Sequence, residues 1–141
     1  QHRLATPLCL DESIHDLDDA AAAIALGACG VLNLKQGRVG GLLESLKIVD
    51  HAKAHGMPVW SGGMDETGIG RAVNIHLQTV DGFTLPGDTS ETRRYFAEDI
   101  VEPPVVLDPE GFIEVPHGPG IGVTVVPERV RKLTIDSERL R

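Results

Sequence analysis

The sequence predicts an α/β fold built from parallel strand–helix units. Short strand-like segments recur roughly every 25 residues, helical patterns fill the gaps, and every strand candidate is followed by charged or glycine residues. Strands that alternate with helices at this period are typical of parallel sheets with right-handed crossovers. Functional residues of such folds lie where the strands end. The strand candidates are residues 7–10, 31–34, 58–61 and 83–86.

Three segments between the strand candidates have a helical pattern. Residues 16–28 are rich in alanine and begin with acidic residues, which the helix dipole favours in a first turn. The second segment, residues 42–56, ends at Gly56 with Pro58 beyond it, a typical helix stop. The third is residues 67–80. We expect one face of the second helix to consist of Leu42, Leu46, Val49 and Lys53.

Composition indicates a globular cytoplasmic protein. The net charge of -8 and the pI of about 5.1 argue against nucleic acid and anionic membranes as partners. No apolar run approaches the roughly 20 residues that a membrane span needs. Cys9 and Cys29 lie in apolar surroundings without a C-x-x-C pattern, so we expect two reduced cysteines in the core.

The pattern changes near residue 101. Residues 101–130 are rich in Pro and Gly and predict extended chain and turns, and residues 130–141 predict a short strand followed by a charged terminus. We therefore predict a partial (β/α) barrel of about four units over residues 1–100 and a tail over residues 101–141. A closed barrel takes about 250 residues. The pattern leaves open a barrel fragment, a doubly wound open sheet and half of an assembled barrel.

Asp11 and Lys35 follow consecutive strand candidates. Neighbouring parallel strands lie about 4.8 Å apart, so the two side chains can share one cavity. A carboxylate there can bind a hard divalent cation, and a lysine amine close to a cation can act as a base. A metal and a lysine base together suit removal of a proton next to a carboxylate. The alternative is that both are unrelated surface residues in two loops.

Five stretches carry a resemblance to a known family. They are TPLCLDESI, NLKQGRVGG, SGGMDETGIGRAVN, FTLPGDTS and VPHGPGIGV, in this order. Together they resemble the C-terminal portion of the o-succinylbenzoate synthase / N-acylamino acid racemase family, in the muconate-lactonizing subgroup of the enolase superfamily. Lysine bases with Mg²⁺ are characteristic of that superfamily. The resemblance implies the C-terminal half of a modified TIM barrel, (β/α)7β, with an extended C-terminal tail that packs on a capping domain.

The resemblance also implies roles for individual residues. Asp11 matches a Mg²⁺ ligand, with Mn²⁺ or Co²⁺ as alternative ions, and Glu12 matches a residue that supports the metal site. Lys35 matches a catalytic lysine that exchanges a proton with the substrate α-carbon. The residues that match the substrate-binding positions are Gly62, Gly63, Met64, Asp65, Glu66 and Tyr95.

The implied function is Mg²⁺-dependent proton abstraction next to the carboxylate of a small-molecule substrate. The reaction is dehydration by an o-succinylbenzoate synthase, racemisation of N-acylamino acids, or both. Two departures stand out: Asp65 lies where the family pattern is apolar, and the other metal ligands and the second lysine are absent from this sequence. The alternatives are a muconate cycloisomerase, a dipeptide epimerase, and a non-catalytic fragment that needs a partner. We expect a homo-oligomer or completion by an N-terminal half.

Overall fold

The structure, a computed structural model, describes residues 1–139. The chain forms two compact units. The first comprises Gln1–Met64 and Asn74–Thr89, and the second comprises Asp65–Val73 and Ser90–Arg141. The predicted division at residue 100 stays a prediction about the complete protein.

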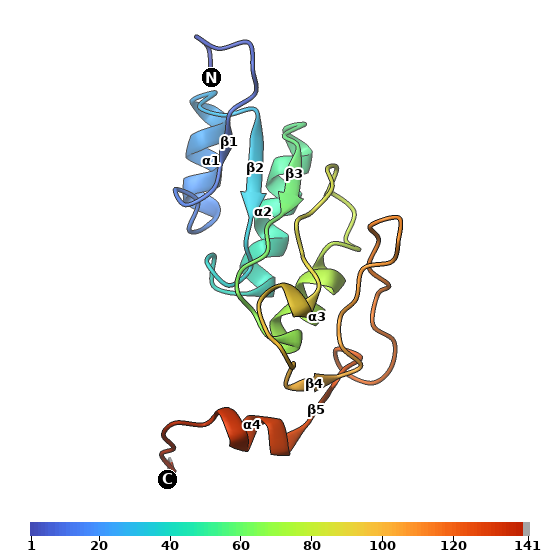
Figure 1. Cartoon of the computed structure of the whole chain (residues 1–141). Coiled ribbons are helices and arrows are strands. Elements are labelled where there is room, and N and C mark those ends of the chain that lie inside the picture. Colours follow the sequence, from blue (N-terminus) through green and yellow to red (C-terminus); the bar gives the residue numbers. More distant parts are fainter. Residues whose placement is uncertain (140–141) are drawn as a thin grey trace. The chain divides into compact units, whose positions relative to one another are not determined.

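The first unit contains a parallel sheet of three short strands in the order β1-β2-β3. The strands are β1 (Cys9–Leu10), β2 (Val31–Leu34) and β3 (Val59–Ser61). Three of the four strand candidates are thus confirmed, together with their parallel direction (Figure 1). The fourth candidate forms only an isolated parallel bridge between Val59 and Phe83.

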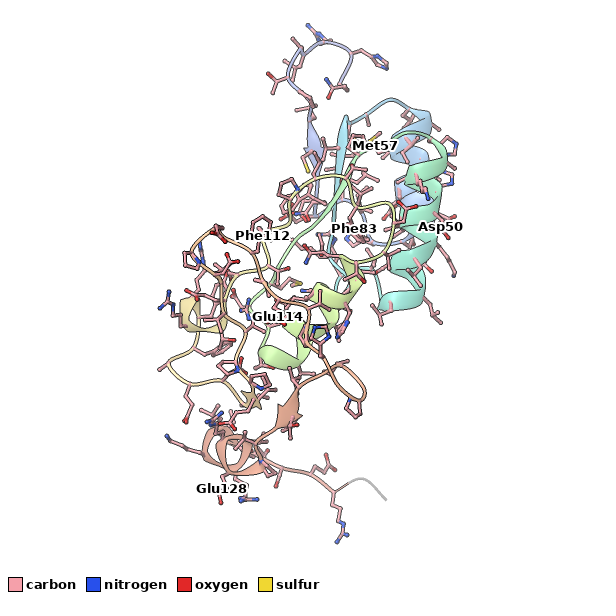
Figure 2. The ribbon with its side chains drawn as sticks, turned by 90° about the vertical axis from the view of Figure 1, so that its right-hand side faces the viewer. Asp50, Met57, Phe83, Phe112, Glu114 and Glu128 are labelled. Atoms are coloured by element: carbon pink, nitrogen blue, oxygen red, sulfur yellow. The ribbon has the colours of Figure 1, made fainter. Side chains whose placement is uncertain are left out.

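Two helices of the first unit cover the same face of this sheet (Figure 2). They are α1 (Leu17–Ala25), whose N-cap Asp16 accepts a hydrogen bond from the Asp19 amide, and α2 (Leu42–Ala54). Their inner residues and the strands form one hydrophobic core. Its buried members are Ile14, Ala20, Ala23, Cys29, Leu32, Leu34, Val39, Ile48, Val49, Ala52, Val59 and Leu77.

The predicted face of α2 is confirmed at Val49, which is buried, and at Leu46, which packs against the core, but it is wrong at Leu42 and Lys53, which are exposed. Its buried residues are Ser45, Ile48, Val49 and Ala52. These positions follow the i, i+3, i+4, i+7 spacing of one helix face, whereas Leu42, one turn earlier at the start of the helix, is 46% exposed. The prediction missed Ser45 and Ala52 because their side chains are small and Ser45 is polar.

Helix α3 (Gly68–Leu77) follows β3, and the boundary between the two units falls within it, after Val73. In the second unit its first turn is held by Asp99, which is 6% exposed. The Asp99 carboxylate accepts hydrogen bonds from the Gly68 amide (2.9 Å) and the Thr92 hydroxyl (2.6 Å). An aspartate that is distant in sequence thus caps this helix.

The other elements of the second unit are short. They are a 3₁₀ turn η1 (Thr92–Arg94), an antiparallel pair of strands β4 (Val101–Glu102) and β5 (Thr124–Val125), and helix α4 (Pro127–Leu133).

Helix α4 corrects the prediction of a strand from residue 130. Pro127 occupies the first turn, where its missing N–H costs nothing, and Glu128 follows it. Arg131 and Lys132 lie in the last turn, where the helix dipole favours cations. These signals favour a helix over the predicted strand. The two residues after Arg139 lie outside the described part of the chain.

The two cysteines also differ from expectation. Both are free thiols, but Cys29, which precedes β2, is buried in the core, while Cys9 of β1 is exposed. Within residues 1–139 the longest helix is α2, whose 13 residues are too few to cross a membrane.

Candidate active site

Asp11 and Lys35 meet at the carboxyl ends of β1 and β2. Each residue directly follows its strand, so the parallel pairing of the strands places both at one edge of the sheet. Lys35 Nζ lies 3.0 Å from Asp11 Oδ2. The lysine side chain is 19% exposed and the aspartate side chain 25%, so the pair is shielded but reachable from solvent. The structure therefore brings together the two residues that the sequence singled out.

Arg38 is a third member of this cluster, and sequence reasoning missed it. Its Nη1 donates to Asp11 Oδ1, while Nε donates to the Ile14 carbonyl and Nη2 to the Asn33 carbonyl, both at 2.7 Å. The Arg38 amide donates to the Lys35 carbonyl at 3.0 Å, which closes a turn directly after the lysine. The sequence did contain a hint of this role, because Arg38 is a second cation three positions after Lys35 in the same glycine-rich loop.

The electrostatics of the cluster favour an anionic ligand. Two cations face one carboxylate, so Asp11, Lys35 and Arg38 together carry a net charge of about +1. Partial burial by itself raises the pKa of the Asp11 carboxyl. The hydrogen bonds from Lys35 and then Arg38, with their positive charges, outweigh burial and lower this pKa below its ordinary value of 3.8.

Gly62 gives the Lys35 side chain room. It directly follows β3, and its amide donates to the Leu34 carbonyl at 2.9 Å. A Cβ added to Gly62 would lie 2.8 Å from Lys35 Cε and would overlap the Asn33 side-chain amide. Asn33 is 2% exposed and its Oδ1 has no hydrogen-bond partner among the described residues. A larger residue at position 62 would therefore displace the lysine or the asparagine.

The other predicted substrate residues are distributed over both units. In the first unit, Met64 Sδ lies 3.7 Å from the position that a Cβ on Gly37 would take. In the second unit, Asp65 is exposed and Glu66 is half-buried. The Tyr95 ring, also in the second unit, has Arg71 Cζ at 4.9 Å and Arg94 Cζ at 5.9 Å from its centroid. The roles of these residues stay predictions.

The residues that the structure describes do not by themselves fit a Mg²⁺ ion. Mg²⁺ prefers about six oxygen ligands in octahedral geometry. Asp11 offers one carboxylate, whose two oxygens already accept from Lys35 and Arg38. Glu12, the predicted support of the metal site, is exposed, and within residues 1–139 there is no group of three His, Cys, Asp or Glu side chains that could hold a metal.

Comparison with known proteins identifies relatives of this chain. It is 52% identical over 132 residues to an N-succinylamino acid racemase of an Amycolatopsis species, and 53% identical over 132 residues to the o-succinylbenzoate synthase of Bacillus subtilis. Each match covers 94% of this chain and 35% of the relative. The chain thus spans about a third of the length of the curated relatives it matches.

Solved structures show the same relationship. An unknown member of the enolase superfamily from Enterococcus faecalis superposes with a TM-score of 0.89 and 46% identity, covering 94% of this chain and 36% of that chain. The muconate lactonizing enzyme of Pseudomonas putida superposes with a TM-score of 0.85 and 28% identity, covering 93% and 36%.

The match to a protein family extends over most of the sequence. Residues 1–129 match the family described as enolase C-terminal domain-like. The parallel strand–helix units agree with this relationship. The chain therefore belongs to the enolase C-terminal domain-like family, with an α/β fold of the TIM-barrel type.

Proposed function

We propose that this chain carries the Lys35 half of the active site of an enzyme that removes the proton next to a substrate carboxylate. The substrate is an o-succinylbenzoate precursor, an N-acylamino acid, or both in turn. In the barrel that we propose for the complete protein, residues 1–100 form the C-terminal strand–helix units and residues 101–141 form a tail on a capping domain. We expect a cytoplasmic enzyme that works as a homo-oligomer or is completed by an N-terminal half.

One observation carries this proposal. Lys35 Nζ lies at the end of a parallel strand, 3.0 Å from the Asp11 carboxylate, in a cluster whose net charge of about +1 suits an anionic substrate. As a neutral amine, Lys35 would take the α-proton of the substrate, and as an ammonium group it would return a proton to the same face. Arg38 would keep a positive charge beside Asp11 throughout, because a guanidinium group does not deprotonate in proteins.

The cofactor belongs to the same proposal. Asp11 would supply one ligand for Mg²⁺, with Mn²⁺ or Co²⁺ as alternatives, and Glu12 would support the ion site. The remaining ligands would come from outside the described residues. When bound, the ion would stabilise negative charge on the substrate carboxylate. Gly62, Gly63, Met64, Asp65, Glu66 and Tyr95 would line the substrate.

The decisive experiment is the Lys35→Ala variant of the complete enzyme. We expect it to abolish exchange of the α-proton for deuterium in one enantiomer of an N-succinylamino acid, because no base remains on that face. Lys53→Ala is the matched control: Lys53 is an exposed lysine of α2 that pairs with Asp81 at 2.5 Å, and its loss should leave exchange unchanged. Full exchange of both enantiomers by Lys35→Ala would sink the role given to Lys35.

A second candidate function is epimerisation of dipeptides. Asp65 favours it, because this exposed carboxylate has no hydrogen bond or ion pair among the described residues and would suit a substrate amino group. A muconate cycloisomerase is the other alternative within the superfamily. A substrate screen with the native enzyme and Asp65→Leu separates these: a dipeptide activity that depends on Asp65 supports the epimerase.

A third candidate is a non-catalytic fragment that needs a partner. The single carboxylate at the candidate metal position favours it for the isolated chain. Calorimetry with Mg²⁺ tests it: tight binding by the 141-residue chain alone would argue against a fragment.

A further inference from the structure

The segment after α3 contains an aspartate that is tied to the main chain beside Lys35. Residues 83–89 return along β3, where the Thr84 amide donates to the Val59 carbonyl at 3.0 Å (Figure 1). Asp88 then makes two bonds to the end of the strand. Its amide donates to the Ser61 carbonyl at 3.2 Å, and its Oδ1 accepts from the Gly63 amide.

These two bonds enclose Gly62. Ser61 precedes this glycine and Gly63 follows it, so the backbone and side chain of one residue, Asp88, fix both neighbours. A Cβ added to Gly63 would lie 3.3 Å from the Asp88 carbonyl oxygen, which shows how closely the two segments approach.

The position of Gly62 in turn limits the space of Lys35. The Gly62 backbone packs against Lys35 Cε and the Asn33 amide so closely that no Cβ fits between them. A shift of Gly62 by a few tenths of an ångström would therefore open or close the space in which the lysine amine stands. Packed interiors transmit such displacements because they contain few voids.

The returning segment is itself anchored, so Asp88 is not a mobile partner. Gln78 Nε2 donates to the Thr89 hydroxyl at 2.8 Å, and Thr89 is 8% exposed. A Cβ added to Gly87 would lie 2.9 Å from the Ser61 carbonyl oxygen and would overlap the Gln78 side chain. Contacts on both sides of Asp88 therefore hold its carboxylate against the Gly63 amide.

We propose that Asp88 is a positioning residue for the candidate base: it clamps Ser61–Gly63, and through Gly62 it sets the place of the Lys35 amine. Asp88 itself touches no reacting atom. The inference rests on the proposed function for its meaning in catalysis, but the clamp is a property of the first unit and can be measured without turnover.

The first test uses nuclear magnetic resonance on the chain itself, with labelled glycine and labelled lysine ε-carbons. Asp88→Ala should move the Gly63 amide signal and the Lys35 ε-methylene signal together. Asp88→Asn should restore both, because an asparagine Oδ1 can accept the same hydrogen bond. The matched control is Asp81→Ala, which removes the exposed partner of Lys53 and should move the Lys53 signal but not that of Lys35.

A Gly63 signal that moves in Asp88→Ala without any change at Lys35 would overturn the proposal, since the clamp would then position nothing. The proposal fails equally if Asp88→Asn perturbs Lys35 as strongly as Asp88→Ala. Should the alanine variant fail to fold, Asp88→Asn against Asp88→Glu gives the same contrast. Glutamate keeps the charge but places its carboxylate one methylene further out, so it should shift the Lys35 signal.

The second test measures turnover in the complete enzyme. Asp88→Ala should lower kcat on the order of tenfold with KM changed less than about threefold, and Asp88→Asn should recover most of the loss. A rise in KM at unchanged kcat would contradict a positioning role. If Lys35→Ala leaves exchange intact while the resonance contrast holds, the proposed function fails and the clamp stands. If Lys35→Ala abolishes exchange and the resonance contrast is absent, the clamp alone fails.

Discussion

The first unit buries far more apolar than polar side chains, whereas the second unit buries the polar residues Arg71, Thr92 and Asp99 beside an equal number of apolar ones. The buried polar residues of the first unit are Asn33, Ser45, Ser61, Asn74 and Thr89. Arg71 is fully buried and donates to the Ser90 carbonyl at 2.7 Å, yet its Nε and Nη2 have no hydrogen-bond partner among the described residues. The fully or nearly buried apolar residues of the second unit are few: Ala72, Val101 and Val105.

This contrast determines how each unit should respond to change. Apolar burial is non-directional and scales with area, so the first unit should lose stability gradually as core atoms are removed. A buried polar network depends on each member, because a partner left unpaired bears its full desolvation cost. The chain has one tryptophan, Trp60 in the first unit, and one tyrosine, Tyr95 in the second, so spectroscopy can follow the two units separately.

The largest effect should come from the aliphatic core. Ile48 on α2 is 0% exposed, and Ile48→Ala should lower the free energy of unfolding by about 2–5 kcal/mol through lost burial and the cavity left behind. Urea unfolding followed by Trp60 fluorescence measures this. Leu43→Ala, on the same helix at 79% exposure, should change stability by less than about 0.5 kcal/mol. An equal shift of the Tyr95 transition in Ile48→Ala would show that the two units unfold together and do not respond separately.

A smaller effect should follow from the network of the second unit. Asp99→Ala removes the acceptor of the Gly68 amide and the Thr92 hydroxyl, and we expect a loss of about 1–3 kcal/mol. The Tyr95 absorbance transition should shift to lower urea while the Trp60 transition stays. Asp108→Ala, which removes an exposed turn aspartate of the same unit, should shift it less. A Trp60 transition that moves as far as that of Tyr95 would contradict the separation.

The smallest predicted effect is the pH dependence of the first unit. The pKa of Asp11 is lowered in the folded chain, so its contribution to stability is present above the ordinary value of 3.8 and is lost as the pH falls through the lowered value. Unfolding by urea at a series of pH values should therefore show a steeper acid loss in the native chain than in Asp11→Asn. Identical slopes below about pH 4 would show that Lys35 and Arg38 do not stabilise the carboxylate.

Local signals in the sequence predicted much of the first unit. The apolar run of Val31–Leu34 and the stop at Gly56 correspond to the observed strand and to the end of α2. Residues 83–86 were predicted as a strand, but they form only the bridge from Phe83 to Val59. Strand pairing depends on the tertiary structure, which the pattern of side chains does not specify. Helix α4 was not predicted, although Pro127 and Glu128 are typical of the first turn of a helix.

The candidate site was predictable only where topology determines position. Asp11 and Lys35 meet because parallel strands end at one edge, and the spacing of the strands indicated this. Arg38 joins them through a loop turn, and Asp88 reaches Gly63 from a segment 25 residues away. No repeating pattern in the sequence predicts either contact, so both were found only in the folded structure.

The exposed face of the sheet has one more property. The Trp60 indole N–H donates to Cys9 Sγ at 3.3 Å across β2, and Cys9 is the exposed thiol of the pair of cysteines. Burial raises the pKa of the Cys29 thiol, so that cysteine should react slowly with alkylating reagents. Because a neighbouring thiol quenches indole emission, alkylation of Cys9 should brighten the tryptophan. The fluorescence of Trp60 should therefore report whether β1 and β3 keep their relative positions.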